Sequence, residues 1–93
     1  MNVPAVTPFE AGLGRNAANH VPLSPLSFIR RTAAVYPDRP AIVHGEHVQS
    51  WAKTWARARR LASALAKRGL APGDVVAVMA PNIPAFVEAH FGI

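Results

Sequence analysis

An uninterrupted apolar run at residues 75–79 (VVAVM) places the strongest constraint on how this 93-residue chain can fold. The run has the length of a β-strand, and both of its alternating faces are apolar. Such a strand is typical of a parallel sheet covered by helices on each side, because a solvent-facing side would carry polar residues. A turn sequence, APGD, precedes it at residues 71–74. The sequence therefore predicts an α/β fold with a buried strand over residues 75–79.

The first part of the chain is predicted to be irregular. Prolines and glycines interrupt residues 1–24, and no apolar periodicity is visible there, so we expect a surface arm. A helix follows, with Ser24 as its N-cap and Pro25 at its first position. Apolar residues recur at helical spacing up to Pro37, which ends the helix. We expect the folded domain to occupy residues 25–93.

A β-hairpin and a long helix are predicted next. Residues 41–44 (AIVH) form a short β-branched run, Gly45-Glu46 makes a tight turn, and residues 47–50 (HVQS) pair back. The helix extends from about Trp51 to Arg68, and Gly69 follows it as a left-handed C-terminal residue. One stripe of this helix is apolar and another is basic: Trp51, Trp55, Ala58, Ala62 and Leu65 form the first, and Lys53, Arg57, Arg60 and Lys67 the second.

Asn82 is predicted to cap a last helix, with Pro84 in its first turn. Asn82 also follows the predicted strand, and ligands in open α/β sheets gather at the carboxyl ends of strands. Both interpretations stay open, and helix capping is favoured. The last helix has no stop signal before Ile93. We therefore expect an incomplete sheet in a truncated domain whose missing remainder would be its partner.

Composition excludes several classes of site. The chain has no cysteine, which excludes disulfides, zinc knuckles and thiol nucleophiles. Its first twenty residues lack a secretory signal, and no stretch approaches the roughly 18 apolar residues of a membrane span. A cytoplasmic location is the default expectation.

The chain is basic, with ten Lys and Arg against five Asp and Glu and a net charge of +5. This balance is compatible with a nucleic-acid or anionic-lipid partner. For the basic stripe of the long helix, a solvated face is favoured over a nucleic-acid surface. The reason is that Trp51 and Trp55 lie on the apolar stripe, where a core would make them unavailable to stack on bases.

Other candidate sites have simpler explanations. His44, Glu46 and His47 are possible metal ligands, but they flank a hairpin tip and no second cluster completes a coordination shell. His20 and His90 stand alone in the sequence. Gly12-Leu13-Gly14 resembles half of a phosphate loop without the strand and helix that such a loop needs, so a flexible linker is favoured. From the residues alone we assign no catalytic, cofactor-binding or metal-binding residue.

Three segments resemble the adenylate-forming (AMP-forming) acyl-CoA synthetases. They are YPDRPAIV at residues 36–43, RLASALAKRGLAPGDVVAVMAPN at residues 60–82 and PAFVEAHFGI at residues 84–93. The resemblance extends from about Asn19 to Ile93. The opening NHVPLSPLSF, residues 19–28, is similar to the subgroup of medium-chain, aromatic and methylmercaptopropionate-type ligases. One departure is the second hairpin strand, which in the family is usually rich in threonine or tyrosine and here is HVQS.

The resemblance implies the start of a large N-terminal domain whose other strands come from later sequence. It also implies an ATP-dependent ligase of fatty acid metabolism that joins a small-molecule carboxylate to coenzyme A, with Mg²⁺ offsetting phosphate charge. The family's phosphate loop, adenine motif, ribose aspartate and mobile lysine have no counterpart in residues 1–93. No site residue is therefore carried over, and we expect this chain to be inactive alone. The alternative is a small stand-alone basic binding module, with nucleic acid as its candidate partner.

Overall fold

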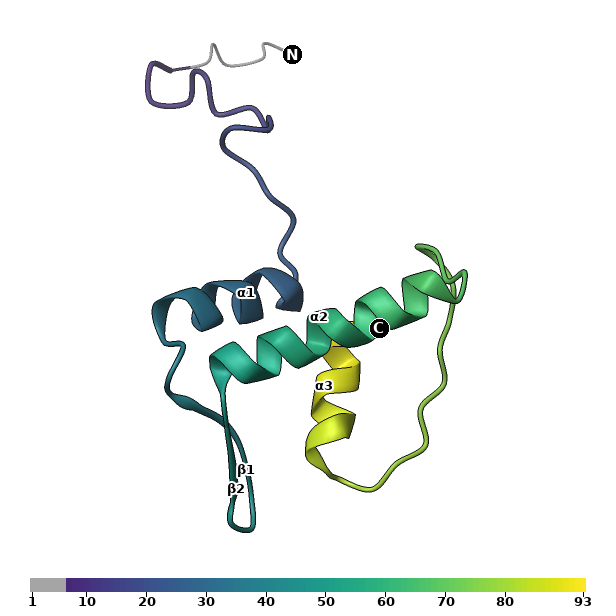
Figure 1. Ribbon diagram of the computed structural model, residues 1–93. Helices are drawn as coiled ribbons and strands as arrows, with labels where there is room; N and C mark the ends of the chain where they lie inside the picture. The colour runs from purple at the N-terminus through teal and green to yellow at the C-terminus, as the bar shows by residue number, and fades with distance from the viewer. Residues whose placement is uncertain (1–6) are drawn as a thin grey trace.

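The computed structural model describes residues 7–93, which form three helices and one β-hairpin (Figure 1). In chain order these are α1 (Pro25–Val35), β1 (Pro40–His44), β2 (His47–Ser50), α2 (Trp51–Lys67) and α3 (Pro84–Gly92). Helix α2 runs through the middle of the molecule, with α1 along its first half and α3 crossing it, and the hairpin projects from its N-terminal end. The expected mixture of helices and sheet is confirmed at this coarse level.

Helix α1 begins as its sequence predicts. The Ser24 side chain accepts a hydrogen bond from the backbone N–H of Leu26 at 3.2 Å, and Pro25 occupies the first turn, where its missing N–H costs nothing. The helix buries Ile29 and Ala33, which are four residues apart and so lie on one face. This face contacts α2.

The hairpin also forms where it was predicted, with β1 and β2 antiparallel and His44 opposite His47. Gly45 has φ 61°, the left-handed value that glycine adopts without strain at the first position of a type II′ turn. The HVQS sequence of β2 pairs fully despite its departure from the family pattern. Its inward side is unusual, because Gln49 is 2% exposed whereas the valine pair Val43 and Val48 faces outward.

Helix α2 has caps at both ends. The Ser50 side chain accepts from the N–H of Lys53 at 3.2 Å. At the other end Gly69 has φ 93°, its N–H donates to the carbonyl of Ala66, and the N–H of Leu70 donates to that of Leu65. This pair of bonds is a Schellman closure, which satisfies carbonyls that the helix itself cannot satisfy.

The buried apolar core of residues 7–93 is small and consists of Ile29, Ala33, Ile42, Ala58 and Ala89. Helices α2 and α3 cross closely at Gly92, where an added Cβ would lie 2.7 Å from Cδ2 of Leu61. Only glycine permits this approach. Trp51 and Trp55 are half-buried, so the apolar stripe of α2 is only partly covered.

Residues 75–79 correct the sequence prediction, because they lie in the connection between α2 and α3 and form no strand within the described chain. Val75 is 92% exposed and Met79 101% exposed, so the segment is not buried either. The turn before it forms as expected: Gly73 has φ 94°, and the Asp74 N–H donates to the carbonyl of Ala71. A strand needs a neighbouring strand for its backbone groups, and β1 and β2 pair with each other.

The start of α3 is a second correction. Ile83, not Asn82, occupies the N-cap, and Asn82 lies in an exposed bend before it. Pro84 is in the first turn as predicted. Residues 7–24 contain turns but no helix or strand, are almost wholly exposed, and extend away from the body of the molecule (Figure 1). The first six residues of the predicted arm lie outside the described residues. Within residues 7–93, no helix combines the length and the apolarity needed to cross a membrane.

Candidate functional site: a buried polar junction

The candidate sites named from the sequence do not come together in space. His44, Glu46 and His47 are exposed at the hairpin tip, and residues 7–93 contain no group of three His, Cys, Asp or Glu side chains placed to hold a metal ion. His20 is exposed in the arm. The Nδ1 atom of His90 lies 2.7 Å from the carbonyl oxygen of Phe86, one turn earlier in α3.

Gly12-Leu13-Gly14 lies in the exposed arm, with nothing within 4 Å of where a Cβ on either glycine would be. No helix begins beside it, since α1 starts at Pro25. The segment therefore lacks the helix N-terminus that a phosphate loop requires.

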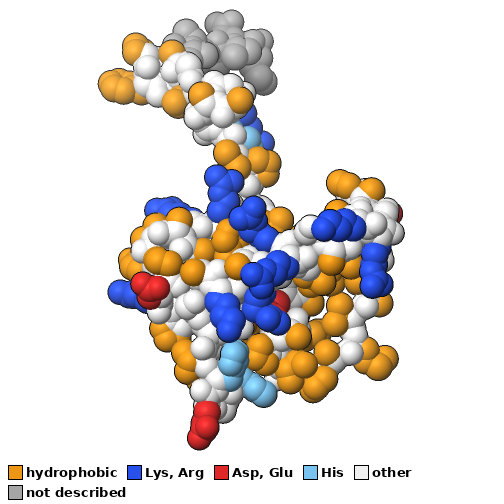
Figure 2. Space-filling model, viewed as in Figure 1, with side chains coloured by type: hydrophobic (Ala, Val, Ile, Leu, Met, Phe, Trp, Pro, Cys, Tyr) orange, Lys and Arg blue, Asp and Glu red, His pale blue; other side chains and the backbone are white. Residues whose placement is uncertain are grey.

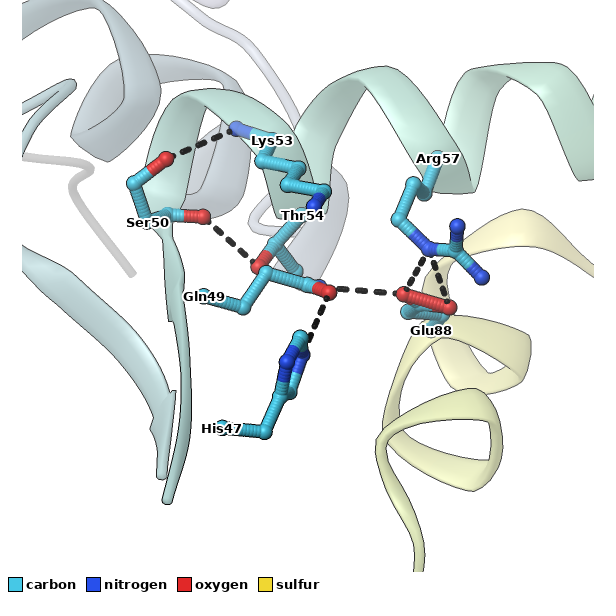
Figure 3. A network of polar contacts seen from close by, with 7 residues as sticks. All are labelled: His47, Gln49, Ser50, Lys53, Thr54, Arg57 and Glu88. Carbon is cyan, nitrogen blue, oxygen red and sulfur yellow. Dashed lines mark hydrogen bonds and ion pairs between the residues drawn. The ribbon is translucent and has the colours of Figure 1, made fainter. Parts of the chain in front are cut away.

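The structure instead brings together polar side chains that the sequence did not single out (Figure 3). Gln49 of β2, Thr54 of α2 and Glu88 of α3 are all buried, at 2%, 1% and 5% exposure. The Gln49 amide nitrogen Nε2 donates to Thr54 Oγ1 at 2.9 Å and to Glu88 Oε2 at 3.0 Å. The Thr54 hydroxyl in turn donates to the carbonyl oxygen of Ser50 at 2.8 Å. One amide group thus links the hairpin to both helices.

Arg57 closes the arrangement from the solvent side. Its Nε lies 2.9 Å from Glu88 Oε1 and 2.6 Å from Oε2, and the side chains are 47% and 6% exposed. The sequence placed Arg57 on a solvated basic stripe, and this is wrong in part, because its guanidinium is committed to a buried carboxylate. Lys53, Arg60 and Lys67 are exposed as expected. We call Gln49, Thr54, Arg57 and Glu88 the polar junction.

The charges in the polar junction are set by opposing effects. Burial by itself would raise the pKa of Glu88, but hydrogen bonds from Arg57 and Gln49, with the charges of Arg57 and His47, outweigh it and lower that pKa. The hydrogen bond and charge of Glu88 raise the pKa of Arg57. Glu88 is therefore ionised at neutral pH, and its pair with Arg57 is a charge-assisted hydrogen bond.

The geometry of the polar junction suits a structural clamp. Both carboxylate oxygens of Glu88 already accept hydrogen bonds. The side-chain oxygen of Gln49, Oε1, lies 3.4 Å from His47 Nε2. Within residues 7–93, every buried side-chain nitrogen or oxygen has a partner. Each carboxylate oxygen of Glu88 is thus held by at least one donor of the chain itself, which favours a structural role. The junction therefore joins three elements of the fold.

One sequence signal could have located this junction. Glu88 is the only charged residue in α3, a helix made otherwise of Pro, Ala, Phe, Val, His and Gly. A lone carboxylate in an apolar helix is buried only with a partner, and Arg57 is one of several basic residues that could supply it. The choice of Arg57, and the burial of Gln49, depend on how α3 crosses α2.

Three comparisons relate this chain to known proteins. The family model described as AMP-binding enzyme matches residues 29–93. A peroxisomal acetate/butyrate–CoA ligase of Arabidopsis thaliana is 53% identical over 76 residues, which are 82% of this chain and 13% of that ligase. An acetate–CoA ligase of Humulus lupulus is 46% identical over 81 residues, 87% of this chain and 14% of that ligase. A peroxisomal benzoate–CoA ligase of A. thaliana is 43% identical over 82% of this chain and 13% of its own length. No solved structure matches.

The relatives also correct the expected location. The acetate/butyrate–, benzoate– and butyrate–CoA ligases of A. thaliana are all designated peroxisomal. The prediction of a cytoplasmic location, which was a default drawn from the absence of targeting patterns, is wrong by this comparison. The chain spans about one seventh of the length of these relatives.

Proposed function

This chain belongs to the AMP-binding enzyme family, and from that premise we propose that it is the N-terminal part of an ATP-dependent acyl-CoA ligase. The observation that carries the proposal is the 53% identity to an acetate/butyrate–CoA ligase over 82% of this chain. Acetate–, benzoate– and cinnamate–CoA ligases are similar to it over comparable stretches. We propose a small carboxylate as the substrate class, because that is what these names share, and the peroxisome as the compartment.

The proposed reaction has two steps. A carboxylate oxygen attacks the α-phosphorus of ATP, forming an acyl-adenylate and releasing pyrophosphate, and the thiol of coenzyme A then displaces AMP to give the thioester. Mg²⁺, when bound, would offset phosphate charge. Residues 7–93 contain no cluster of three His, Cys, Asp or Glu side chains that could hold this ion. No step is therefore assigned to a residue of this chain.

The contribution of this chain is architectural in our proposal. Residues 25–93 would be the start of the large N-terminal domain, and residues 1–24 an arm that precedes it. The polar junction holds the hairpin and α3 against α2. In our proposal it thereby orients the segment that connects α2 to α3 toward the rest of the enzyme. A stand-alone nucleic-acid-binding module stays a prediction that no observation here favours.

Carboxylate-dependent exchange of pyrophosphate into ATP tests the proposed function. The full-length protein encoded by the same gene should catalyse exchange with acetate, butyrate, benzoate or cinnamate, and the 93-residue chain should not. Exchange by the 93-residue chain alone would show that the catalytic groups lie within it. The assignment to this reaction would be refuted if the folded full-length protein catalysed neither exchange nor thioester formation with any of these four carboxylates in the presence of coenzyme A. Fluorescent tagging of the full-length protein would test the compartment.

A further inference from the structure

The guanidinium of Arg57 is only partly used by the polar junction. Its Nε–H is the donor that contacts Glu88, with the nitrogen 2.9 Å and 2.6 Å from the two carboxylate oxygens. Figure 3 shows no contact to either of the two terminal nitrogens, and the described residues 7–93 give them no hydrogen-bond partner. These terminal N–H groups form the end of the fork, which is the edge that binds two oxygens of an anion. Arg57 can therefore hold Glu88 and a second anion at the same time.

Arg57 also lines a pocket of about 270 Å³, together with Arg60, Leu61, Ala85 and Glu88. Arg60 follows Arg57 by three residues on α2, so the two side chains are neighbours on the helix surface. Arg60 is exposed, and within residues 7–93 it takes part in no ion pair. Leu61 and Ala85 add an apolar wall. The volume lies just below the range of about 300–1,000 Å³ that is usual for small-molecule sites.

The charge balance of this pocket favours an anion in spite of Glu88. Glu88 is buried, and its charge is paired with that of Arg57. Two arginines against one carboxylate leave a net charge of +1 on the lining, and among residues 7–93 no other acidic side chain lines the pocket. Lys53, one turn before Arg57 on α2, is exposed and adds to the positive potential. Figure 2 shows Lys and Arg side chains gathered along α2.

Among anionic groups, a phosphate matches this pair of arginines better than a carboxylate does. The fork of one guanidinium engages both oxygens of a carboxylate, whereas a phosphate has further oxygens that can accept from a second arginine. Because Glu88 already holds Arg57 in place, binding costs less side-chain freedom than it would at an unanchored arginine. Leu61 and Ala85 offer contact to an apolar group joined to the phosphate.

We propose that Arg57 and Arg60 bind the phosphate group of a small phosphate monoester, and that the organic part of this molecule contacts Leu61 and Ala85. The Nε–H of Arg57 stays on Glu88, while its terminal N–H groups and the guanidinium of Arg60 donate to the phosphate oxygens. The inference does not depend on the proposed function, because it rests on contacts among residues 7–93 alone.

Calorimetric titration of the full-length protein with phenyl phosphate and with inorganic phosphate, at constant ionic strength, tests the site. Phenyl phosphate should bind more tightly, because its ring contacts the apolar wall. Arg60→Ala should weaken its binding by about tenfold or more, since the change removes charge-assisted hydrogen bonds without touching the polar junction. Arg68→Ala is the matched control, because it removes the same charge from the end of α2 outside the pocket, and it should weaken binding by less than about twofold.

Four outcomes would overturn the proposal. Equal weakening by the two substitutions would assign binding to the general positive potential. Inorganic phosphate bound as tightly as phenyl phosphate would make free phosphate the ligand. An equal loss of benzoate binding in Arg60→Ala would make the site one for carboxylates. A parent protein that binds neither probe at millimolar concentration would exclude the site.

Thermal melts show whether each variant is folded. Arg60→Lys is a second variant that keeps the charge and replaces the planar fork by a single ammonium, so its affinity for phenyl phosphate should lie between those of the parent and Arg60→Ala. Full affinity in Arg60→Lys would show that the fork is not used. Because binding requires no turnover, loss of ligase activity would bear on the proposed function and not on this site.

Discussion

The polar junction and the segment at residues 75–79 differ in both burial and hydrogen bonding. The sequence predicts burial for the apolar residues 75–79 and not for the polar side chains of the junction, and the structure shows the reverse. At the junction every buried polar atom is paired by residues of the described chain, up to 39 positions apart. At residues 75–79 the side chains are apolar and the backbone unpaired, and the segment stays in water. Burial thus depends on where the partners lie in the sequence.

Glu88→Ala should have the largest effect on this comparison. The change leaves the buried Gln49 amide without one acceptor and removes the charge-assisted hydrogen bonds of Arg57, which together should cost about 2–3 kcal/mol. Urea unfolding followed by tryptophan fluorescence measures this loss, since Trp51 and Trp55 lie on α2. Asp74→Ala, which removes the other carboxylate of residues 69–93, is the control and should cost much less. Equal losses would mean that the junction is not a clamp.

Gly92→Ala should have the next largest effect, because it forces α2 and α3 apart. The new Cβ would approach Leu61 Cδ2 to 2.7 Å and Leu61 Cβ to 2.9 Å. Overpacking of this kind should cost about 1–2 kcal/mol, near the lower end of its usual range because Leu61 is half-exposed and can shift. Thermal melting measures it, with Gly14→Ala in the arm as the control. The combination G92A/L61A should recover part of the loss, and no recovery would place the strain elsewhere.

Arg57→Ala separates the junction from the basic stripe. Arg57 is partly in water, so its loss should cost about 1 kcal/mol, more than a surface change and less than the loss of Glu88. Arg60→Ala, on the same helix and exposed, should change the free energy of unfolding by no more than about 0.5 kcal/mol. Parallel urea titrations of the two variants compare them. If they unfold together, Arg57 belongs with the solvated residues, as the sequence first suggested.

Acid should weaken the junction and leave residues 75–79 as they are. The folded-state pKa of Glu88 lies below its ordinary value of 4.5, so its contribution to stability is complete above that value. The contribution falls as the pH drops through the lower, folded pKa. Glu88→Gln should remove this part of the acid dependence while keeping the side chain's size. Unfolding free energies of both proteins between pH 7 and pH 3 test this, and parallel curves would exclude Glu88 as the titrating group.

Met79→Ser should have the smallest effect in the 93-residue chain. Its side chain is fully exposed, so the free energy of unfolding should change by no more than about 0.5 kcal/mol. A clear loss of stability in a thermal melt would show that Met79 is buried in solution, which would contradict the exposure of residues 75–79.

Local sequence accounts for the ends of the helices and the turn of the hairpin. Ser24 and Pro25 start α1, Gly45 turns the hairpin, and Gly69 closes α2, because each depends on hydrogen bonds or dihedral angles within a few residues. Local sequence failed at Asn82, where the chain begins α3 one residue later and Ile83 takes the cap position. The family could also be identified from the amino-acid sequences of residues 36–43, 60–82 and 84–93 and from their order, and the match over residues 29–93 confirms it.

Which side chains and backbone groups have partners depends on the tertiary arrangement. The crossing of α3 over α2 chose Arg57 for Glu88, 31 residues away, and turned Gln49 inward in place of Val48. No periodicity encodes those choices, because they depend on how elements distant in sequence meet. The strand predicted at residues 75–79 also depends on a partner that is distant in sequence. Its apolar sequence is suited to a sheet, but strand hydrogen bonds are made between segments, and within residues 7–93 no segment pairs with it.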